Sequence, residues 1–308
     1  MNFAVILSGG TGSRMKGAQE PKQYLKVGGR MVISYCLEVL FETPCLDAFV
    51  VVADQFWQPC IKEEISRLLS GREMRQKGRK ASVDGKTAQP DRKSIVDVET
   101  IQPNGHVSVD GETARLERKS FVDGKTIQPD RNIYLNRKIA PRFLGFVHPG
   151  DNRQISVFHA LRFLKEFADD RDFVLIHDAA RPLVTVRQLT DCICAAQKAD
   201  GCVPVLPMKD TVYYSRSGGR IESLLKRECV FAGQAPEAFV FGKYYRANER
   251  LDYEEMLAVN GSTEPAVMAG MDIMVIPGEE GNFKITTVED LGRFEQKIKV
   301  TVQTSTLH

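Results

Sequence analysis

No stretch of the sequence approaches the roughly 18 consecutive apolar residues that a membrane-spanning helix needs, so we expect no membrane partner. Residues 1–7 are mostly apolar, but this run is too short for a secretory signal and no basic residues flank it. We therefore expect a cytoplasmic protein. The 308 residues, 43% of them hydrophobic and 27% charged, suffice for one large core or two modest ones, which excludes a disordered tail.

Neither sign of charge dominates, because 42 Lys and Arg residues oppose 40 Asp and Glu residues. With a net charge of +2 we expect no nucleic-acid partner, and any anion site must be a local cluster of cations. The seven cysteines include no Cys-x-x-Cys pair, which indicates reduced thiols rather than a disulfide framework. Cys192 and Cys194 have no second ligand pair nearby, so we interpret them as thiols rather than zinc ligands.

Short apolar runs alternate with segments of helical spacing at both ends of the chain. The apolar runs predict buried strands at residues 4–7, 48–53, 143–147, 173–176 and 201–205. The helical spacing predicts helices at residues 32–40, 61–69, 156–167 and 186–198. This order is typical of an α/β fold, with a mostly parallel sheet covered by helices on both faces and ligands at the carboxyl ends of its strands.

A tandem repeat interrupts this pattern. Residues 79–130 hold four copies of a 13-residue unit, Arg-Lys-Ser-x-Val-Asp-Gly-Lys-Thr-x-Gln-Pro-Asp. Each copy has too few large apolar side chains to build a core, so we interpret the repeat as an exposed or disordered insertion. The predicted organisation is a first half over 1–71, the insertion over 72–138, a second half over 139–300 and a tail over 301–308.

The first predicted strand ends at a glycine-rich loop, Ser8-Gly9-Gly10-Thr11-Gly12. Glycines let backbone N–H groups approach an anion closely, and Arg14 and Lys22 add positive charge a few residues on. This combination favours a triphosphate site. A dinucleotide-binding loop is the competing interpretation, but its third glycine is replaced by Met15, and it has little use for the two cations.

A second predicted strand delivers polar residues to the same edge of the sheet. Residues 173–176 lead into His177, Asp178 and Arg181, at the end of the strand where ligands are expected. The Asp178 carboxylate can hold Mg²⁺; the competing interpretation is a helix-capping Asp beside a surface Arg. We interpret His177 as a packed neighbour, because attack by a phosphate leaves no proton for a base to remove.

The sequence resembles the cytidylyltransferases that make CDP-methylerythritol or CDP-ribitol. Five motifs in order carry the resemblance, at residues 8–15, 21–23, 150–157, 177–182 and 282–291. The resemblance covers residues 1 to about 70 and about 140 to 298, nearly everything outside the repeat. It implies a Rossmann-like nucleotidyltransferase fold, a reaction between CTP and a polyol phosphate, Mg²⁺ as cofactor, and a homodimer.

The resemblance also implies a role for each matching residue. Arg14 and Lys22 would stabilise the pentacoordinate phosphorus formed when the acceptor phosphate attacks CTP, and Lys284 would assist. The nucleotide would be bound by Ser8, Gly9, Gly10, Gly12, Gly150, Asp151 and Ser156. The acceptor would be bound by Asp178, Arg181, Thr211 and Arg227, the last across a dimer interface.

The sequence departs from the family pattern where the acceptor would bind. Ala235 stands where the family usually has a threonine before proline, so one hydroxyl contact is lost. Glu264 and Pro265 change a loop near the substrate, since proline removes an N–H and fixes φ. Two acceptors therefore remain as alternatives. Family frequency favours 2-C-methyl-D-erythritol 4-phosphate, whereas the spacing from Arg14 to Lys22 resembles that of the enzymes that use ribitol 5-phosphate.

Two other classes of function compete with nucleotidyl transfer. An NAD-dependent oxidoreductase would account for the alternation of strands and helices and for Gly10 and Gly12, but Met15 opposes it. An interaction protein would use the repeat to bind a partner while the α/β fold merely carries it.

Overall fold

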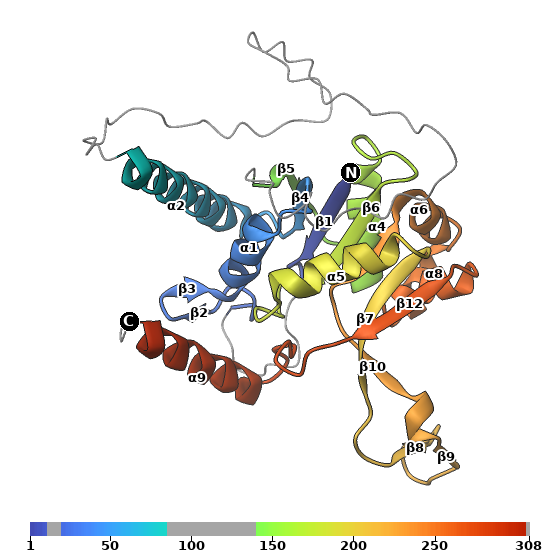
Figure 1. Cartoon of the computed structure of the whole chain (residues 1–308). Coiled ribbons are helices and arrows are strands. Elements are labelled where there is room, and N and C mark those ends of the chain that lie inside the picture. Colours follow the sequence, from blue (N-terminus) through green and yellow to red (C-terminus); the bar gives the residue numbers. More distant parts are fainter. Residues whose placement is uncertain (11–19, 85–139, 306–308) are drawn as a thin grey trace.

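The computed structural model describes residues 1–10, 20–84 and 140–305 (Figure 1). The strands of its central sheet are β1 (Asn2–Leu7), β4 (Ala48–Val52), β5 (Arg142–Val147), β6 (Phe173–Asp178), β7 (Gly201–Pro207), β10 (Phe231–Gly233), β11 (Glu237–Val240) and β12 (Ile273–Pro277). The helices are α1 (Val32–Glu42), α2 (Gln58–Asp84), α4 (Arg153–Leu164), α5 (Val186–Ala196), α6 (Phe241–Glu249), α7 (Tyr253–Ala258), α8 (Thr263–Met268) and α9 (Val288–Ser305). Among these helices, none is both long and apolar enough to span a bilayer.

The central sheet is mixed but mostly parallel, with the order β10-β7-β11-β6-β1-β4-β5 and β12 beside β7. Pairing is parallel between β1 and β4, β1 and β6, β4 and β5, and β7 and β12. This confirms the predicted α/β class. The antiparallel strand β11 separates β6 from β7, and the prediction missed it because its four residues directly follow Pro236 and carry no clear strand pattern.

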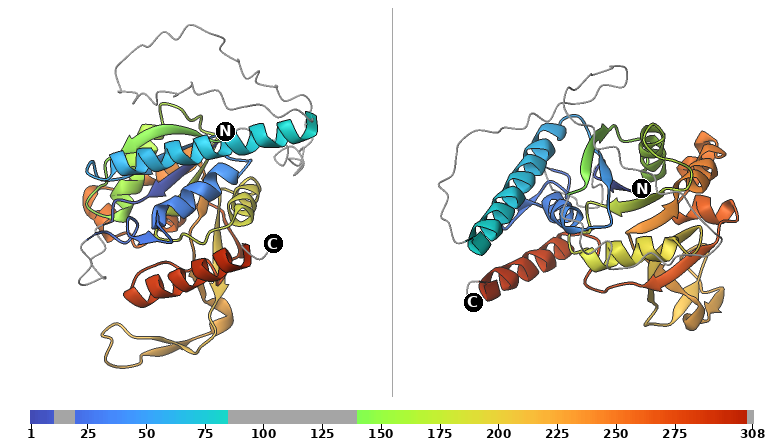
Figure 2. Two further views of the ribbon diagram at one scale, coloured as in Figure 1. Left: turned by 90° about the vertical axis from the view of Figure 1, so that its left-hand side faces the viewer. Right: turned by 45° about the horizontal axis from the view of Figure 1, so that its top comes forward.

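Helices cover both faces of the sheet, and each face has its own hydrophobic core (Figure 2). In β1, Ala4 and Ile6 point toward the core under α1, α2 and α5, whereas Phe3 and Val5 point toward the core under α4 and α6. Burial on both sides requires apolar residues at every position, which explains why the strands read as continuous apolar runs rather than alternating ones.

The two halves of the chain meet inside one sheet, because β4 from the first half pairs with β5 from the second. Helix α2 continues to Asp84, past the predicted boundary at residue 71 and into the first repeat unit. Helix α9 likewise runs to Ser305, into the predicted tail. The rest of the repeat lies outside the described residues, so the insertion and the domain boundaries stay predictions.

Two smaller elements leave the sheet. The hairpin of β8 (Val212–Tyr214) and β9 (Ser223–Leu225), with the 3₁₀ turn Arg227–Cys229, projects away from the sheet between β7 and β10 (Figure 1); we call residues 208–230 the arm. The hairpin of β2 (Lys26–Val27) and β3 (Arg30–Met31) packs against α9 through a third apolar cluster.

Candidate active site

A pocket of about 350 Å³ opens at the carboxyl ends of β1 and β6, beside the loop that follows β5. Of the predicted site residues, it is lined by Gly9, Gly10, Lys22, Gly150, Asp151, Ser156, Asp178 and Lys284. The parallel pairing of β1 with β6 sets Leu7 beside Asp178, which brings the glycine loop and the second polar motif together. Gly12 and Arg14 lie outside the described residues.

Hydrogen bonds hold the segment that carries Lys22 against the glycine loop. The Gln23 side chain donates to the carbonyl oxygens of Ser8 at 2.6 Å and Gly10 at 2.8 Å. The Tyr24 hydroxyl donates to the Ser8 carbonyl at 2.8 Å, and burial raises the pKa of Tyr24 to about 12, so the donor keeps its proton. Ser8 itself is buried, and its hydroxyl donates to the Val52 carbonyl at 2.7 Å. The Ser8 N–H donates to the same carbonyl at 2.9 Å, so the backbone of Ser8 is engaged as well, and Ser8 does not line the pocket.

Two glycines allow close packing around the loop after β5: Gly9 from the loop after β1 lies against it, and Gly150 lies against the start of α4. A Cβ atom on Gly9 would come within 2.4 Å of Pro149, and one on Gly150 within 2.2 Å of Ile155. Both distances are shorter than real Cβ atoms show, so a larger residue at position 9 would push the two loops apart, and one at position 150 would push the turn away from the first turn of α4. The close approach explains these two glycines without requiring a direct contact with phosphate.

The turn before α4 presents Asp151 to the pocket. Asn152 caps α4 by accepting a hydrogen bond from the Ile155 N–H at 2.8 Å. The Ser156 hydroxyl accepts from the Gly150 N–H at 2.9 Å and donates to the Asn152 carbonyl at 2.8 Å. Ser156 thus fixes the turn. The positive end of the α4 dipole faces the pocket, which favours an anionic ligand.

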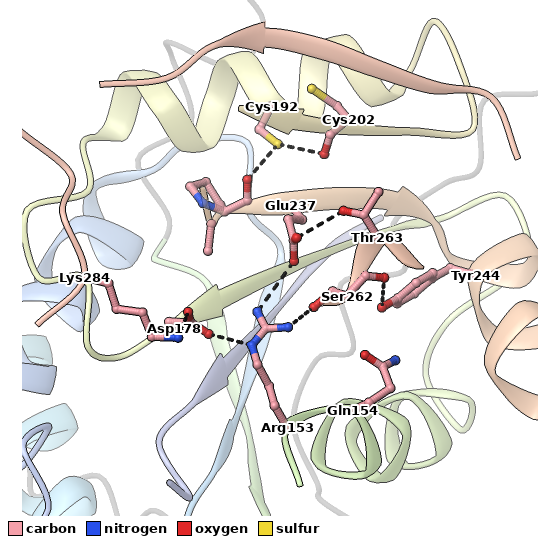
Figure 3. Close-up of polar contacts among 12 residues, drawn as sticks. Arg153, Gln154, Asp178, Cys192, Cys202, Glu237, Tyr244, Ser262, Thr263 and Lys284 are labelled. Atoms are coloured by element: carbon pink, nitrogen blue, oxygen red, sulfur yellow. Dashed lines mark hydrogen bonds and ion pairs between the residues drawn. The ribbon is translucent and has the colours of Figure 1, made fainter. Parts of the chain in front are cut away.

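Asp178 lies at the centre of the charged groups in the pocket (Figure 3). One carboxylate oxygen is 3.0 Å from the Arg153 Nε, and the other is 2.8 Å from the Lys284 Nζ. Burial alone would raise the pKa of this carboxyl, but Arg153 and Lys284 hold it well below its ordinary value. The two cations therefore favour the ionised form of Asp178.

The donor set around Asp178 does not fit a metal ion held by the protein alone. Both carboxylate oxygens already face cations, and the described part of the chain has no group of three His, Cys, Asp or Glu side chains placed to hold a metal ion. Mg²⁺ prefers six oxygen ligands and usually takes most of them from water and substrate phosphates. The predicted role of Asp178 as a metal ligand thus has no support in this geometry.

The segment between β12 and α9 brings Lys284 into the pocket. The Ile285 N–H donates to the Ala180 carbonyl at 2.8 Å, and the Arg181 side chain donates to the Asn282 carbonyl at 2.7 Å. The buried Asn282 side chain donates to the Ala235 carbonyl at 2.8 Å. Arg181 therefore fastens this segment to the end of β6, and it does not line the pocket.

The two remaining predicted acceptor residues lie on the arm. Thr211 is exposed, and the Arg227 side chain donates to the Lys209 carbonyl at 2.8 Å. Neither residue lines the pocket of its own chain.

Pro265, one of the departures from the family pattern, fits the helix in which it lies. Pro265 is the third residue of α8, in the first turn, where a backbone N–H has no partner within the helix. The hydroxyls just before it are engaged, because Ser262 accepts a hydrogen bond from Arg153 and Thr263 donates to Glu237 at 3.1 Å.

Gln23 and Arg153 also line the pocket, although neither was predicted as a site residue. Both lie inside motifs of the family resemblance, at 21–23 and 150–157. The charge of Arg153, directly after Gly150-Asp151-Asn152, was the signal that could have identified it. Glu237 carried no such signal.

Comparison with protein families gives two matches. The model described as 2-C-methyl-D-erythritol 4-phosphate cytidylyltransferase matches residues 125–299, more than half of the chain. A model described as a MobA-like NTP transferase domain matches residues 4–76.

Curated relatives match over nearly the whole chain. The 2-C-methyl-D-erythritol 4-phosphate cytidylyltransferase of Geobacter metallireducens is 28% identical over 300 residues, which covers 96% of this chain and 97% of the relative. The bifunctional enzyme IspD/IspF of Desulforudis audaxviator is 35% identical over 94% of this chain and 54% of the relative.

Solved structures share the fold. The 4-diphosphocytidyl-2C-methyl-D-erythritol synthase of Anaerococcus prevotii aligns with a TM-score of 0.62 at 18% identity, over 97% of this chain and 96% of that one. The 2-C-methyl-D-erythritol 4-phosphate cytidylyltransferase of Francisella tularensis aligns with a TM-score of 0.60 at 17% identity, over 96% and 98%. At these identities the likeness concerns the fold alone.

His177 gives a prediction about stability and pH. Its Nε2 lies 3.2 Å from the Arg181 carbonyl, and burial lowers its pKa from 6.5 to about 4. The unfolded chain therefore binds a proton that the folded chain refuses, so stability falls as the pH drops from about 6.5 toward 4. We expect the free energy of unfolding to lose about 2 kcal/mol from this residue between pH 7.5 and 5.

Urea unfolding at both pH values, for the wild type and His177→Gln, measures this contribution. The variant should lose less stability on acidification than the wild type. An equal loss in both proteins would show that His177 is already able to take up a proton in the folded state.

Proposed function

The chain belongs to the 2-C-methyl-D-erythritol 4-phosphate cytidylyltransferase family, and from this membership we propose that it transfers CMP from CTP to 2-C-methyl-D-erythritol 4-phosphate. The reaction class of the family is CTP-dependent nucleotidyl transfer in isoprenoid precursor synthesis. The observation that carries the proposal is the pocket itself, where Lys22 and Lys284 lie together with the glycine loop at the carboxyl ends of β1 and β6.

In the proposed reaction, an oxygen of the acceptor phosphate attacks the α-phosphorus of CTP. A new P–O bond forms, the bond to the bridging oxygen of the β-phosphate breaks, and pyrophosphate leaves with that electron pair. The phosphorus passes through a state with more negative charge on its oxygens, which Arg14, Lys22 and Lys284 stabilise. The attacking phosphate oxygen carries no proton, so His177 has no role as a base.

The nucleotide is proposed to lie between the loops after β1 and β5. Backbone groups of Gly9 and Gly10, with Gly12 further along the loop, contact the phosphates and base, while Gly150 and Asp151 contact cytosine and ribose. Ser156 holds the second loop in shape. The Gln23 and Tyr24 hydrogen bonds support the proposal, because they place Lys22 beside the first loop before any ligand arrives.

Magnesium is proposed to enter with CTP, bound mainly by its phosphate oxygens. The ion would neutralise charge on the leaving pyrophosphate. Asp178 is instead proposed to contact the hydroxyl groups of the acceptor, beside the acceptor phosphate.

The proposal is tested by an acceptor panel. Purified protein with CTP and Mg²⁺ should release pyrophosphate with 2-C-methyl-D-erythritol 4-phosphate, and EDTA should abolish the release. Ribitol 5-phosphate is the matched comparison, because the spacing from Arg14 to Lys22 resembles that of the ribitol enzymes. Faster release with ribitol 5-phosphate would reassign the acceptor, and no release with either compound would refute the proposed function.

Lys22 should be needed for turnover but not for folding. We expect Lys22→Ala to lower kcat at least 100-fold, since a preorganised charge at the transition state contributes about 3 kcal/mol or more. The melting temperature should stay near that of the wild type, because the side chain borders a pocket rather than the core. Lys26→Ala, which removes an exposed lysine from the neighbouring hairpin, is the control and should keep full activity. Wild-type turnover in Lys22→Ala would refute the role of this lysine.

A homodimer is proposed in which each arm reaches the pocket of the partner. Within its own chain the arm projects away from the sheet, and it exposes Tyr213, Ile221 and Leu224. Exposed apolar groups of this size are typical of an interface. Thr211 and Arg227 would then contact acceptor bound by the second subunit.

Mixing two inactive variants tests this arrangement. In a mixed dimer of Lys22→Ala and Arg227→Ala subunits, one pocket carries both defects and the other carries neither. Random exchange of subunits should therefore restore about one quarter of wild-type activity. A mixture of Lys22→Ala and Lys284→Ala is the control and should stay inactive, since both lysines line the pocket of one chain. Failure of the first mixture after demonstrated exchange would exclude the shared site.

A further inference from the structure

Four charged side chains alternate in sign from the interior of the molecule to the pocket (Figure 3). Glu237 on β11 lies 3.5 Å from an Arg153 guanidinium nitrogen, Arg153 on α4 contacts Asp178 on β6, and Asp178 contacts Lys284. We call these residues the charge row. They come from four separate segments of the chain, so only the folded structure assembles them.

The two cations of the charge row differ in freedom. All three guanidinium nitrogens of Arg153 have protein partners, namely Asp178, Ser262 and Glu237. This planar group is held on three sides and cannot turn toward a ligand without losing several contacts. Lys284 carries a compact ammonium on a flexible stem, and its ion pair is with Asp178.

The position of Lys284 creates an energetic problem for the proposed reaction. To contact a phosphate group the ammonium must give up part of its contact with Asp178. Asp178 is 7% exposed, and breaking a buried ion pair by taking away one partner typically costs about 3–5 kcal/mol. Such a cost would cancel much of what the lysine contributes at the phosphate.

We propose that Arg153 is a positioning residue that stays on Asp178 as its permanent counter-ion and so frees Lys284 to move to the phosphate groups of the substrate. Glu237 and Ser262 hold Arg153 in place for this task. When Lys284 leaves, the Asp178 carboxylate still faces one full positive charge 3.0 Å away. The inference rests on the proposed function, since it assigns a partner for Lys284 in that reaction.

The first test separates charge from shape at position 153. Arg153→Gln should lower kcat about 100-fold, the loss that misplacing a catalytic group typically causes. The KM for CTP should change much less, because Lys284 acts on the transferring phosphate. Arg153→Lys keeps a positive charge, so its kcat should be at least tenfold higher than that of Arg153→Gln. Arg187→Gln, a matched change at an exposed arginine on α5, should leave kcat and KM unchanged.

The second test is a double-mutant cycle with Asp178→Asn. Once the carboxylate is neutral, Lys284 has no buried charge to leave behind, so adding Arg153→Gln should cost less than about threefold in kcat. The double variant leaves no carboxylate at position 178 without a counter-ion, so it removes one cause of poor folding in Arg153→Gln; Glu237 keeps its hydrogen bond from Thr263 in both variants. The inference would be overturned if the loss of kcat in the double variant equalled the product of the losses in the two single variants. Wild-type kcat in Arg153→Gln would also overturn it.

These outcomes are distinct from failure of the proposed function. A wild-type enzyme that releases no pyrophosphate with either acceptor refutes the function itself. An active wild type with an unaffected Arg153→Gln variant refutes the role of Arg153 alone.

Discussion

The parallel pairing of β1 with its two neighbours determines where the chemistry of this protein can take place. Because Leu7 lies beside Val52 on one side and Asp178 on the other, three strands end at the same level. The chain must turn at each of these ends, and each turn carries polar groups that the sheet interior could not accept. A shift of one residue in this register would exchange the two buried faces of β1 and separate Asp178 from the glycine loop.

Most polar groups around the pocket serve to hold other groups in place. Gln23, Tyr24 and Ser156 bond to backbone atoms of the loops, and Asn282 ties the Lys284 segment to the neighbouring turn. Fewer side chains of the described pocket are left to face a ligand, and these include the cations Lys22 and Lys284. This division is consistent with phosphoryl transfer, in which catalysis depends on the placement of charge rather than on a reactive side chain.

The sequence allowed the parallel part of the sheet to be predicted, because burial on both faces leaves unbroken apolar runs such as residues 48–53. Strand β11 was missed because its partners come from β6 and β7, and no local pattern records such distant contacts. In the site, Lys22 and Lys284 were found through motifs. The support that Glu237 gives to Arg153 could not be predicted, since it depends on contacts between β11, α4 and α8 that only the tertiary structure brings about.

The way the second half of the chain enters the sheet has a consequence for evolution and engineering. Residue 142 begins β5 at its amino end, whereas the pocket lies at the carboxyl ends of the strands. The chain therefore rejoins the sheet at the rim opposite the ligand. The entropy of closing a loop grows by only about 0.6 kcal/mol for each doubling of its length. Sequence could thus be gained, lost or replaced here, even by a fused reporter domain, while the catalytic rim keeps its geometry.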